Sequence, residues 1–295
     1  MFAQSPVFSG NFHWASRHFS LPHRIARSLD HNHSILMKIT TTLCTLIAIL
    51  MPAVAQEATP KTLKVEGWGV AQNPAEDCLF KTGDGGKLTI TVPGSPKPHD
   101  LSAELGNTNA PRVLQEVEGD FTIQVKIEGE FAPGGESTQE GRTGYTGAGL
   151  VVFADANNFV RIERATLQRS GGPATPYTNF EIRVHGELEG FGGTGDFRTE
   201  ADKPTWLRLE RKGTQLRGAM SQDGVNWTYG EPKELFAEPW NRKGILAGVA
   251  AISTSQKPFA PVYSELNLKH QGKPDEAKPD TAKPEPKVEG KTDPK

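Results

Sequence analysis

Charged side chains and one tryptophan recur at every second position in three segments near the middle of the chain, and this spacing could create a binding face. In a β-strand, residues i and i+2 point to the same side of the sheet. These positions are the odd-numbered Arg161, Glu163, Glu181, Arg183, His185 and Glu187 and the even-numbered Trp206, Arg208 and Glu210. We predict that they line one solvent-facing surface of neighbouring strands.

Two interpretations of this face remain open. Acids and bases that alternate across strands form ion pairs of about 0.2 to 1 kcal/mol each, which would be a structural role. The same groups could bind carbohydrate, because guanidinium and carboxylate groups pair with sugar hydroxyls while an aromatic ring, here Trp206, packs beneath the sugar. Three loops would form the rim, at 133–147 with Tyr145, 171–179 with Tyr177 and 190–198 with Phe191.

Catalytic patterns in the sequence are weak. Hydrolysis of a glycosidic bond requires two carboxyl groups a few ångströms apart. Glu116 with Glu118, and Glu187 with Glu189, have the i, i+2 spacing, but each pair lies beside a glycine-containing turn, where exposure to solvent explains it. No Gly-x-Ser-x-Gly sequence is present to offer a serine nucleophile. We predict no catalytic residue and keep a glycan hydrolase or lyase as an alternative.

The sequence predicts neither a metal site nor a cofactor. The segment 83–86 has one carboxylate, which is too few for calcium. Residues 221–227 resemble a sialidase Asp box that is one residue short, so we interpret both segments as turns. Two cysteines, Cys44 and Cys78, can supply neither a disulfide framework nor a four-thiolate zinc site.

The segments that would position these residues have the period-two alternation of half-buried strands. They are expected at 63–70, 87–92, 121–128, 149–153, 160–163, 180–185, 206–210, 216–221, 226–229, 244–252 and 261–268. Helical periodicity is nearly absent, so folds that alternate strands and helices are excluded. The predicted fold is all-β, an antiparallel two-sheet jelly-roll sandwich forming one domain over 59–270.

Residues 148–164, Ala-Gly-Leu-Val-Val-Phe-Ala-Asp-Ala-Asn-Asn-Phe-Val-Arg-Ile-Glu-Arg, resemble the central hairpin of an uncharacterised family of bacterial secreted domains, the enolase-regulator-like domain of unknown function. Segments 121–131, 206–212 and 221–227 continue this resemblance in the same order. The family is grouped with concanavalin A-like lectins and glucanases. The resemblance implies a curved jelly roll of two antiparallel sheets and a role near carbohydrate, although a fold does not fix a function.

Both ends of the chain differ from the middle. Residues 37–55 have the features of a signal peptide: Lys38, an apolar run too short to span a bilayer of about 30 Å, and small residues before the cleavage position. Residues 1–36 are predicted to be a mis-assigned N-terminal extension, the alternative being an unusually long signal n-region. Residues 271–295, rich in Lys, Pro and Glu, are predicted to be a disordered tail.

Composition limits the partners. With 33 Lys and Arg against 35 Asp and Glu, the chain has no general attraction for nucleic acid. We expect an exported protein, periplasmic or extracellular, without a membrane span after signal cleavage. The predicted function is a non-catalytic module that binds a polysaccharide or other glycan or mediates envelope interactions. A structural envelope protein without a small ligand is a further alternative, and the sequence leaves the oligomeric state open.

Overall fold

The computed structural model describes residues 63–94, 96–191, 197–235, 238–240 and 242–270. The predicted extension 1–36, signal peptide 37–55 and tail 271–295 lie outside these residues. Sixteen strands and two short 3-10 helices are present in the described part, and it contains no α-helix. Among the described residues, no helix is long and apolar enough to cross a membrane.

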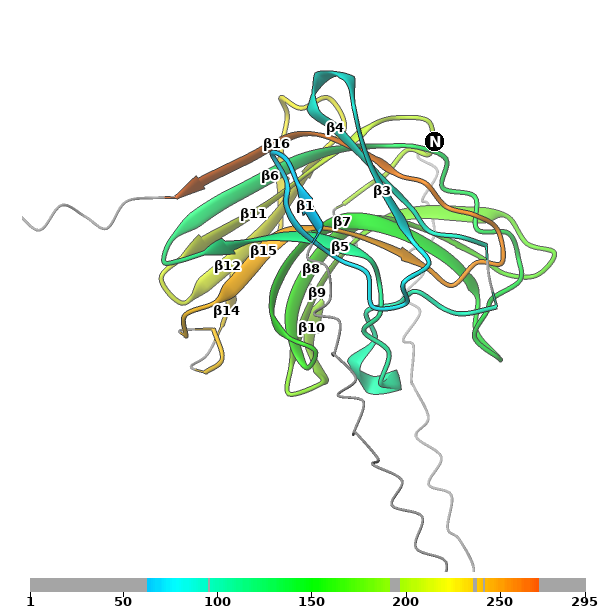
Figure 1. Ribbon diagram of the computed structural model, residues 1–295, viewed down its shortest axis with the longest axis horizontal. Coiled ribbons are helices and arrows are strands. Elements are labelled where there is room, and N and C mark those ends of the chain that lie inside the picture. Colours follow the sequence, from blue (N-terminus) through cyan, green and yellow to red (C-terminus); the bar gives the residue numbers. More distant parts are fainter. Residues whose placement is uncertain (1–62, 95, 192–196, 236–237, 241, 271–295) are drawn as a thin grey trace, which may run out of the picture. The chain divides into compact units, whose positions relative to one another are not determined.

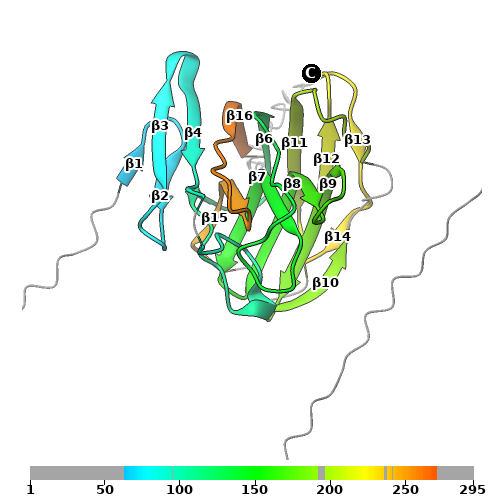
Figure 2. The same ribbon diagram turned by 90° about the vertical axis from the view of Figure 1, so that its right-hand side faces the viewer.

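The strands form two antiparallel sheets, which confirms the predicted all-β sandwich (Figures 1 and 2). The first, called sheet A here, has the order β1 (Leu63–Val65), β2 (Gly69–Gln72), β5 (Arg112–Val117), β15 (Ile245–Ser253), β7 (Gly144–Asp155), β8 (Asn158–Gln168), β9 (Ala174–Val184) and β10 (Glu187–Phe191). Consecutive strands β7 to β10 are neighbours in it, so this part of the sheet is a meander that local chain reversals build.

The second sheet, sheet B, joins strands that are far apart in the sequence. Its order is β13 (Thr228–Tyr229), β12 (Gln215–Ser221), β11 (Thr205–Lys212), β6 (Phe121–Glu128), β16 (Val262–His270), β4 (Lys87–Thr91) and β3 (Leu79–Gly83), with β14 (Lys233–Glu234) also paired to β12. The hairpins β1–β2 and β3–β4 lie side by side at one side of the sandwich (Figure 2).

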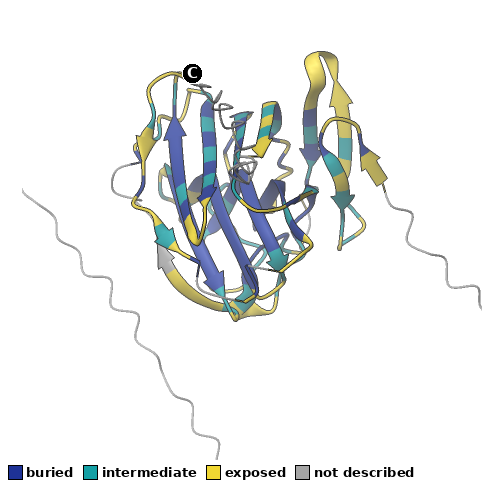
Figure 3. Ribbon diagram, turned by 90° about the vertical axis from the view of Figure 1, so that its left-hand side faces the viewer, coloured by how far each residue is buried: buried dark blue, intermediate teal, exposed yellow. Residues whose placement is uncertain are grey.

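The core between the two sheets is formed by the alternate residues that the sequence pattern predicted. Phe121, Ile123, Val125 and Ile127 are fully buried, as are Leu207 and Leu209 of the adjacent strand. From sheet A, Ile162 and Phe180 pack into the same cluster. Burial is greatest along the middle strands (Figure 3). The strand registers of β6, β8, β9 and β11 are therefore as the alternation predicted.

The outer face of sheet A carries a second apolar cluster, which the alternation did not predict. It consists of Leu101, Ala110, Leu114, Val151, Phe153, Phe159, Ala250 and Ile252. The segment 99–110, with the 3-10 helix η2 (Ala103–Leu105), packs here and brings Leu101 and Ala110 onto the sheet. Residues on both faces of β7 are consequently buried, which explains why 149–153 is continuously apolar.

Two tight turns frame β8 and β9. Asp155 pairs with Asn158 across the predicted turn, so the hairpin of the central segment is confirmed. After β9 the chain reverses at His185 and Gly186, which have φ values of 52° and 84°. Two successive residues with positive φ make the twist of a two-residue hairpin turn. The predicted strand 180–185 therefore ends one residue earlier, at Val184.

Candidate functional site

The predicted site residues divide between the two sheets and do not share a face. Arg161 and Glu163 lie on β8 and Glu181 and Arg183 on β9, all on the outer face of sheet A. Trp206 and Arg208 lie on β11, on the outer face of sheet B. The hydrophobic core separates the two groups, so the prediction of a single surface was wrong. Alternation determines that a side chain points away from the core, whereas strand pairing determines from which sheet it points.

A network of charged side chains, here called the β8–β9 cluster, joins Arg161, Glu163, Asn179, Glu181 and Arg183. Arg161 Nη2 donates to Glu181 Oε2 at 2.7 Å and Arg161 Nε lies 3.4 Å from Glu163 Oε1. Arg183 Nε donates to the other Glu181 oxygen. Asn179 Nδ2 contacts both carboxylates, at 3.4 Å from Glu163 Oε1 and 3.2 Å from Glu181 Oε2.

This cluster is buried rather than solvated, which corrects the expectation of an exposed ladder of ion pairs. Glu163 and Glu181 are each 2% exposed, and Arg161 and Arg183 are 8% and 7% exposed. The segment 99–110 contributes to this burial, because Glu104 Oε2 of η2 accepts from Arg183 Nη1 at 2.9 Å. Burying an unpaired charge would cost several kcal/mol of stability. The ion pairs within the cluster offset this cost.

Two tyrosines stand beside the cluster. Tyr145 and Tyr177 are half-buried and lie on β7 and β9, so they belong to strands and not to the loops that the sequence suggested. Gly147 lies between Tyr145 and the cluster. A Cβ atom at Gly147 would stand 2.6 Å from the Tyr145 hydroxyl and 2.8 Å from Glu163 Oε2. A side chain at this position would therefore collide with both the Tyr145 hydroxyl and the Glu163 carboxylate.

The two carboxyl groups of the cluster have opposite electrostatic environments. Burial raises the pKa of Glu163 above its ordinary value of 4.5, although the Arg161 charge opposes this. Burial also acts on Glu181, but the charges of Arg161 and Arg183 outweigh it and lower the pKa of Glu181. Burial raises the pKa of the Tyr145 and Tyr177 hydroxyls, which stay protonated at neutral pH. The site therefore combines hydroxyl donors, a firmly ionised carboxylate and a second carboxyl group that holds a proton more readily.

One donor of the cluster has no partner. Arg161 Nη1 is buried and forms no hydrogen bond to any described residue. Most buried polar atoms in proteins are hydrogen-bonded, so an unpartnered guanidinium nitrogen in a polar cluster is a place where a water molecule or a ligand oxygen would be bound.

On sheet B, the ring predicted to be the floor of a sugar site is already in contact with other groups. Trp206 Nε1 donates to Glu265 Oε2 at 2.9 Å, and Lys126 Nζ lies 4.9 Å from the ring centroid. Gly224 also packs against the ring, because a Cβ atom there would stand 3.0 Å from Trp206 Cε2. Arg208 stacks on the Trp227 ring at 3.8 Å. Trp206 is half-buried, and Glu265, Lys126 and Gly224 already contact it where a sugar would have to stack.

His185 and Glu187 are also separate from the β8–β9 cluster. His185 lies in the β9–β10 turn, where its backbone N–H donates to Asn158 Oδ1 at 2.9 Å, and its side chain is exposed. Glu187 begins β10 and is exposed. Sequence reasoning missed Asn179 and Glu104. Asn179 has the same parity as Glu181 and could have been found by the alternation, whereas Glu104 lies in a segment without periodicity.

Comparisons with known proteins give similar folds only. No protein-family model matches the chain, and no curated protein sequence matches it. A functionally unknown protein from Saccharomyces cerevisiae is 18% identical with a TM-score of 0.48, over 72% of this chain and 100% of that protein. The GH43 protein BlXynB from Bacillus licheniformis is 15% identical with a TM-score of 0.45, over 62% of this chain and 32% of that protein. The carbohydrate-binding module CBM66 from Bacillus subtilis is 10% identical with a TM-score of 0.35, over 69% of this chain and 98% of that module.

The chain thus spans about a third of the length of the GH43 protein. Similarity at this level shows only that the folds are alike. What those proteins bind or hydrolyse is a property of those proteins. The described residues define an antiparallel two-sheet β-sandwich with a buried polar cluster on one outer face.

Proposed function

We propose that this protein is an exported, non-catalytic β-sandwich module that binds carbohydrate on the outer face of sheet A, at the β8–β9 cluster. The observation that carries the proposal is the buried Arg161 guanidinium, held by Glu163 and Glu181 but with Nη1 unpartnered, next to two half-buried tyrosines. The resemblance of residues 148–164 to secreted domains of the concanavalin A-like group is consistent with this function and with export.

The energetics of buried ion pairs support a ligand role for the cluster. The desolvation cost of buried ions is of order several kcal/mol each, so replacing such pairs by apolar residues is often neutral or stabilising. A sheet face that needed stability alone would extend the apolar cluster of Phe153 and Phe159, which lies immediately beside Arg183. Fixed guanidinium and carboxylate groups next to aromatic rings instead suit vicinal hydroxyls, which need paired donors and acceptors and a flat apolar contact.

The test is retention of the full chain on immobilised polysaccharides and a glycan array. Tyr177→Ala removes a half-buried ring beside the cluster and should weaken retention at least tenfold while the protein stays folded. Trp227→Ala is the matched control, since this half-buried ring directly precedes β13 and stacks on Arg208 at the outer face of sheet B, on the opposite side of the sandwich. Loss of binding in Trp227→Ala with full binding in Tyr177→Ala would move the site to sheet B. No retention on any glycan would favour the structural envelope protein.

A second candidate function, a glycan hydrolase or lyase, is favoured by one specific observation. Glu163 and Glu181 share Arg161 and Asn179 as partners, yet their pKa values shift in opposite directions. Neighbouring carboxyl groups with divergent pKa values are the arrangement that acid–base catalysis uses. Release of new reducing ends from a polysaccharide, abolished by Glu163→Gln, would establish this function in place of simple binding.

A further inference from the structure

Three side chains of metal-binding type meet at the side of the sandwich where the hairpins β1–β2 and β3–β4 lie. Asp77 and Cys78 directly precede β3, and His99 follows β4. His99 Nε2 lies 2.8 Å from Asp77 Oδ1, and Cys78 Sγ lies 3.4 Å from the same oxygen. The carboxylate, thiol and imidazole atoms all lie within 4.8 Å of one another. Asp77 and His99 are 22 positions apart in the sequence, and the group is independent of the carbohydrate site proposed above.

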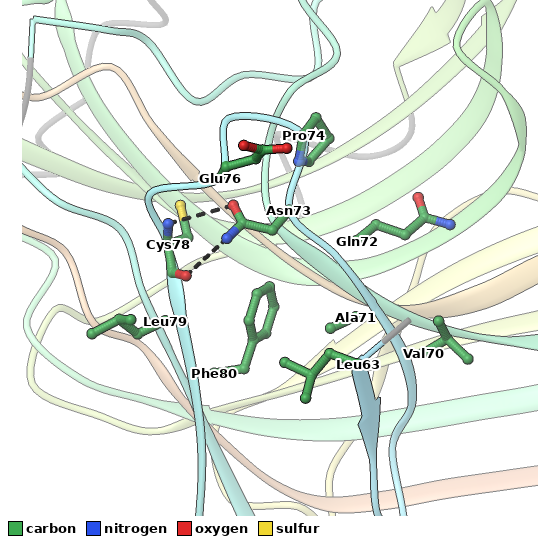
Figure 4. A pocket seen from close by; sticks show the side chains of 10 residues that line it. All are labelled: Leu63, Val70, Ala71, Gln72, Asn73, Pro74, Glu76, Cys78, Leu79 and Phe80. Carbon is green, nitrogen blue, oxygen red and sulfur yellow. Dashed lines mark hydrogen bonds between the residues drawn. The ribbon is translucent and has the colours of Figure 1, made fainter. Parts of the chain in front are cut away.

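Hydrogen bonds to their backbone groups hold Cys78 and His99 in position. Asn73 clamps Cys78 from both sides: its Nδ2 donates to Cys78 O at 2.9 Å and its Oδ1 accepts from Cys78 N at 3.4 Å (Figure 4). His99 forms a β-bridge to Ser253 of β15, with N to O distances of 2.9 and 2.8 Å. A site built on rigid elements retains its geometry without the ligand, as a binding site requires.

The imidazole and the thiol of this group are buried. His99 is 1% exposed and Cys78 is 5% exposed, and the second ring nitrogen of His99, Nδ1, is buried without a hydrogen-bond partner among the described residues. Nδ1 lies on the other edge of the ring, so Nε2, which faces Asp77, is the nitrogen that would bind an ion. Cobalt or zinc in tetrahedral coordination has bonds of about 2.0 to 2.3 Å, which places neighbouring ligand atoms about 3.3 to 3.5 Å apart. The Cys78–Asp77 separation of 3.4 Å falls in this range and the His99–Asp77 separation of 2.8 Å is shorter, so a rotation of the Asp77 side chain that breaks its hydrogen bond to His99 would make room for an ion.

We propose that Asp77, Cys78 and His99 bind a divalent transition-metal cation of the zinc class, through one carboxylate, one thiolate and one imidazole. This donor set, mixed in nitrogen, oxygen and sulfur, suits a borderline-soft ion and not calcium or magnesium, which take oxygen ligands. Three protein ligands leave a fourth position for water or for a group from outside the protein.

A groove open to solvent lies beside Cys78. It has a volume of about 740 Å³ and lies between β2 and the start of β3, with Cys78 and Glu76 among its lining residues (Figure 4). The Asp77 side chain is 31% exposed, so an ion can enter without unfolding of the sandwich. The other lining residues of the groove include the apolar Leu63, Val70 and Phe80.

The experiment is a titration of the chelator-treated full chain with Co²⁺, followed by displacement with Zn²⁺. Binding should produce the thiolate-to-cobalt charge-transfer absorption, and Zn²⁺ should remove it. Cys78→Ser should abolish this band, while Cys44→Ser, which removes the other cysteine, should keep it. Zn²⁺ should also raise the Tm of the wild-type protein and not that of Cys78→Ser, because an ion bound only by the folded state stabilises it.

Circular dichroism of each metal-free variant checks that it folds. If Cys78→Ser does not fold, Asp77→Asn and His99→Gln replace it, and each should weaken Co²⁺ binding at least tenfold. The absence of a thiolate band in the wild-type protein would overturn the proposal. A band that survives in Cys78→Ser but is lost in Cys44→Ser would overturn it as well, because the thiolate would then come from outside this group.

Discussion

Neutralising Glu181 should destabilise the protein much more than neutralising Glu163, although both carboxylates contact Arg161. Glu181 accepts from Arg161 Nη2 at 2.7 Å and also pairs with Arg183, whereas the Glu163 contact to Arg161 is 3.4 Å. Glu181→Gln leaves two buried guanidinium groups without their shared counter-charge, which costs about 3 to 5 kcal/mol when such a pair is broken. Glu163→Gln removes a charge that burial already disfavours and should cost about 1 kcal/mol or less.

The pH dependence of the two variants should differ in sign. Folding lowers the pKa of Glu181. Its carboxylate therefore stabilises the folded state at pH values above the ordinary pKa of 4.5, and this stabilisation is lost as the pH falls through the pKa of the folded state. The difference between wild type and Glu181→Gln should therefore shrink below about pH 4.5. Folding raises the pKa of Glu163. The stabilisation that its protonated form provides is therefore complete below pH 4.5 and is lost as the pH rises through the pKa of the folded state. The cost of Glu163→Gln should therefore be smaller at neutral pH than below pH 4.5.

The assay is urea unfolding followed by circular dichroism between pH 3 and pH 8, with the slope m compared to verify two-state behaviour. Glu187→Gln is the matched control, since this exposed glutamate starts β10 beside the same strands and should change the free energy of unfolding by less than about 0.5 kcal/mol. A larger loss in the free energy of unfolding for Glu163→Gln than for Glu181→Gln would refute the reasoning that Glu181 is the ionised carboxylate and that Glu163 holds a proton more readily.

Three further predictions test the fold. Leu207→Ala should lower the free energy of unfolding by about 2 to 5 kcal/mol because this side chain is fully buried, whereas Trp206→Ala should cost about 1 kcal/mol; the reverse order in urea unfolding would mean that the register of β11 is shifted by one residue. In metal-free Cys44→Ser protein, Cys78 should react slowly with a thiol reagent, because burial raises the pKa of its thiol to about 12; complete reaction within seconds would contradict this. Ending the chain after His270 should change the free energy of unfolding by less than about 0.5 kcal/mol, since the removed segment has few apolar residues, and a clearly lower Tm would show that it packs on the sandwich.

The amino-acid pattern alone was sufficient to predict which side chains face the core. Leu207 and Leu209 are buried and Trp206 is not, as the alternation required, and the turn between Asp155 and Asn158 follows from its local residues. These features depend on interactions between residues close in sequence: the pleat that sends neighbours to opposite faces, and side chains that stabilise tight turns.

The tertiary structure alone decided where the polar residues meet and whether they are solvated. Pairing of β11 with β6 and of β8 with β9 put Trp206 and Arg161 on opposite sides of the sandwich. The segment 99–110 then covered part of the outer face and helped to bury the charges. It also brought His99 to Asp77 through its bridge to Ser253. Alternation cannot encode these outcomes, because the period of two is the same for every strand, while strand partners are selected by hydrogen bonds and packing between residues far apart in the chain.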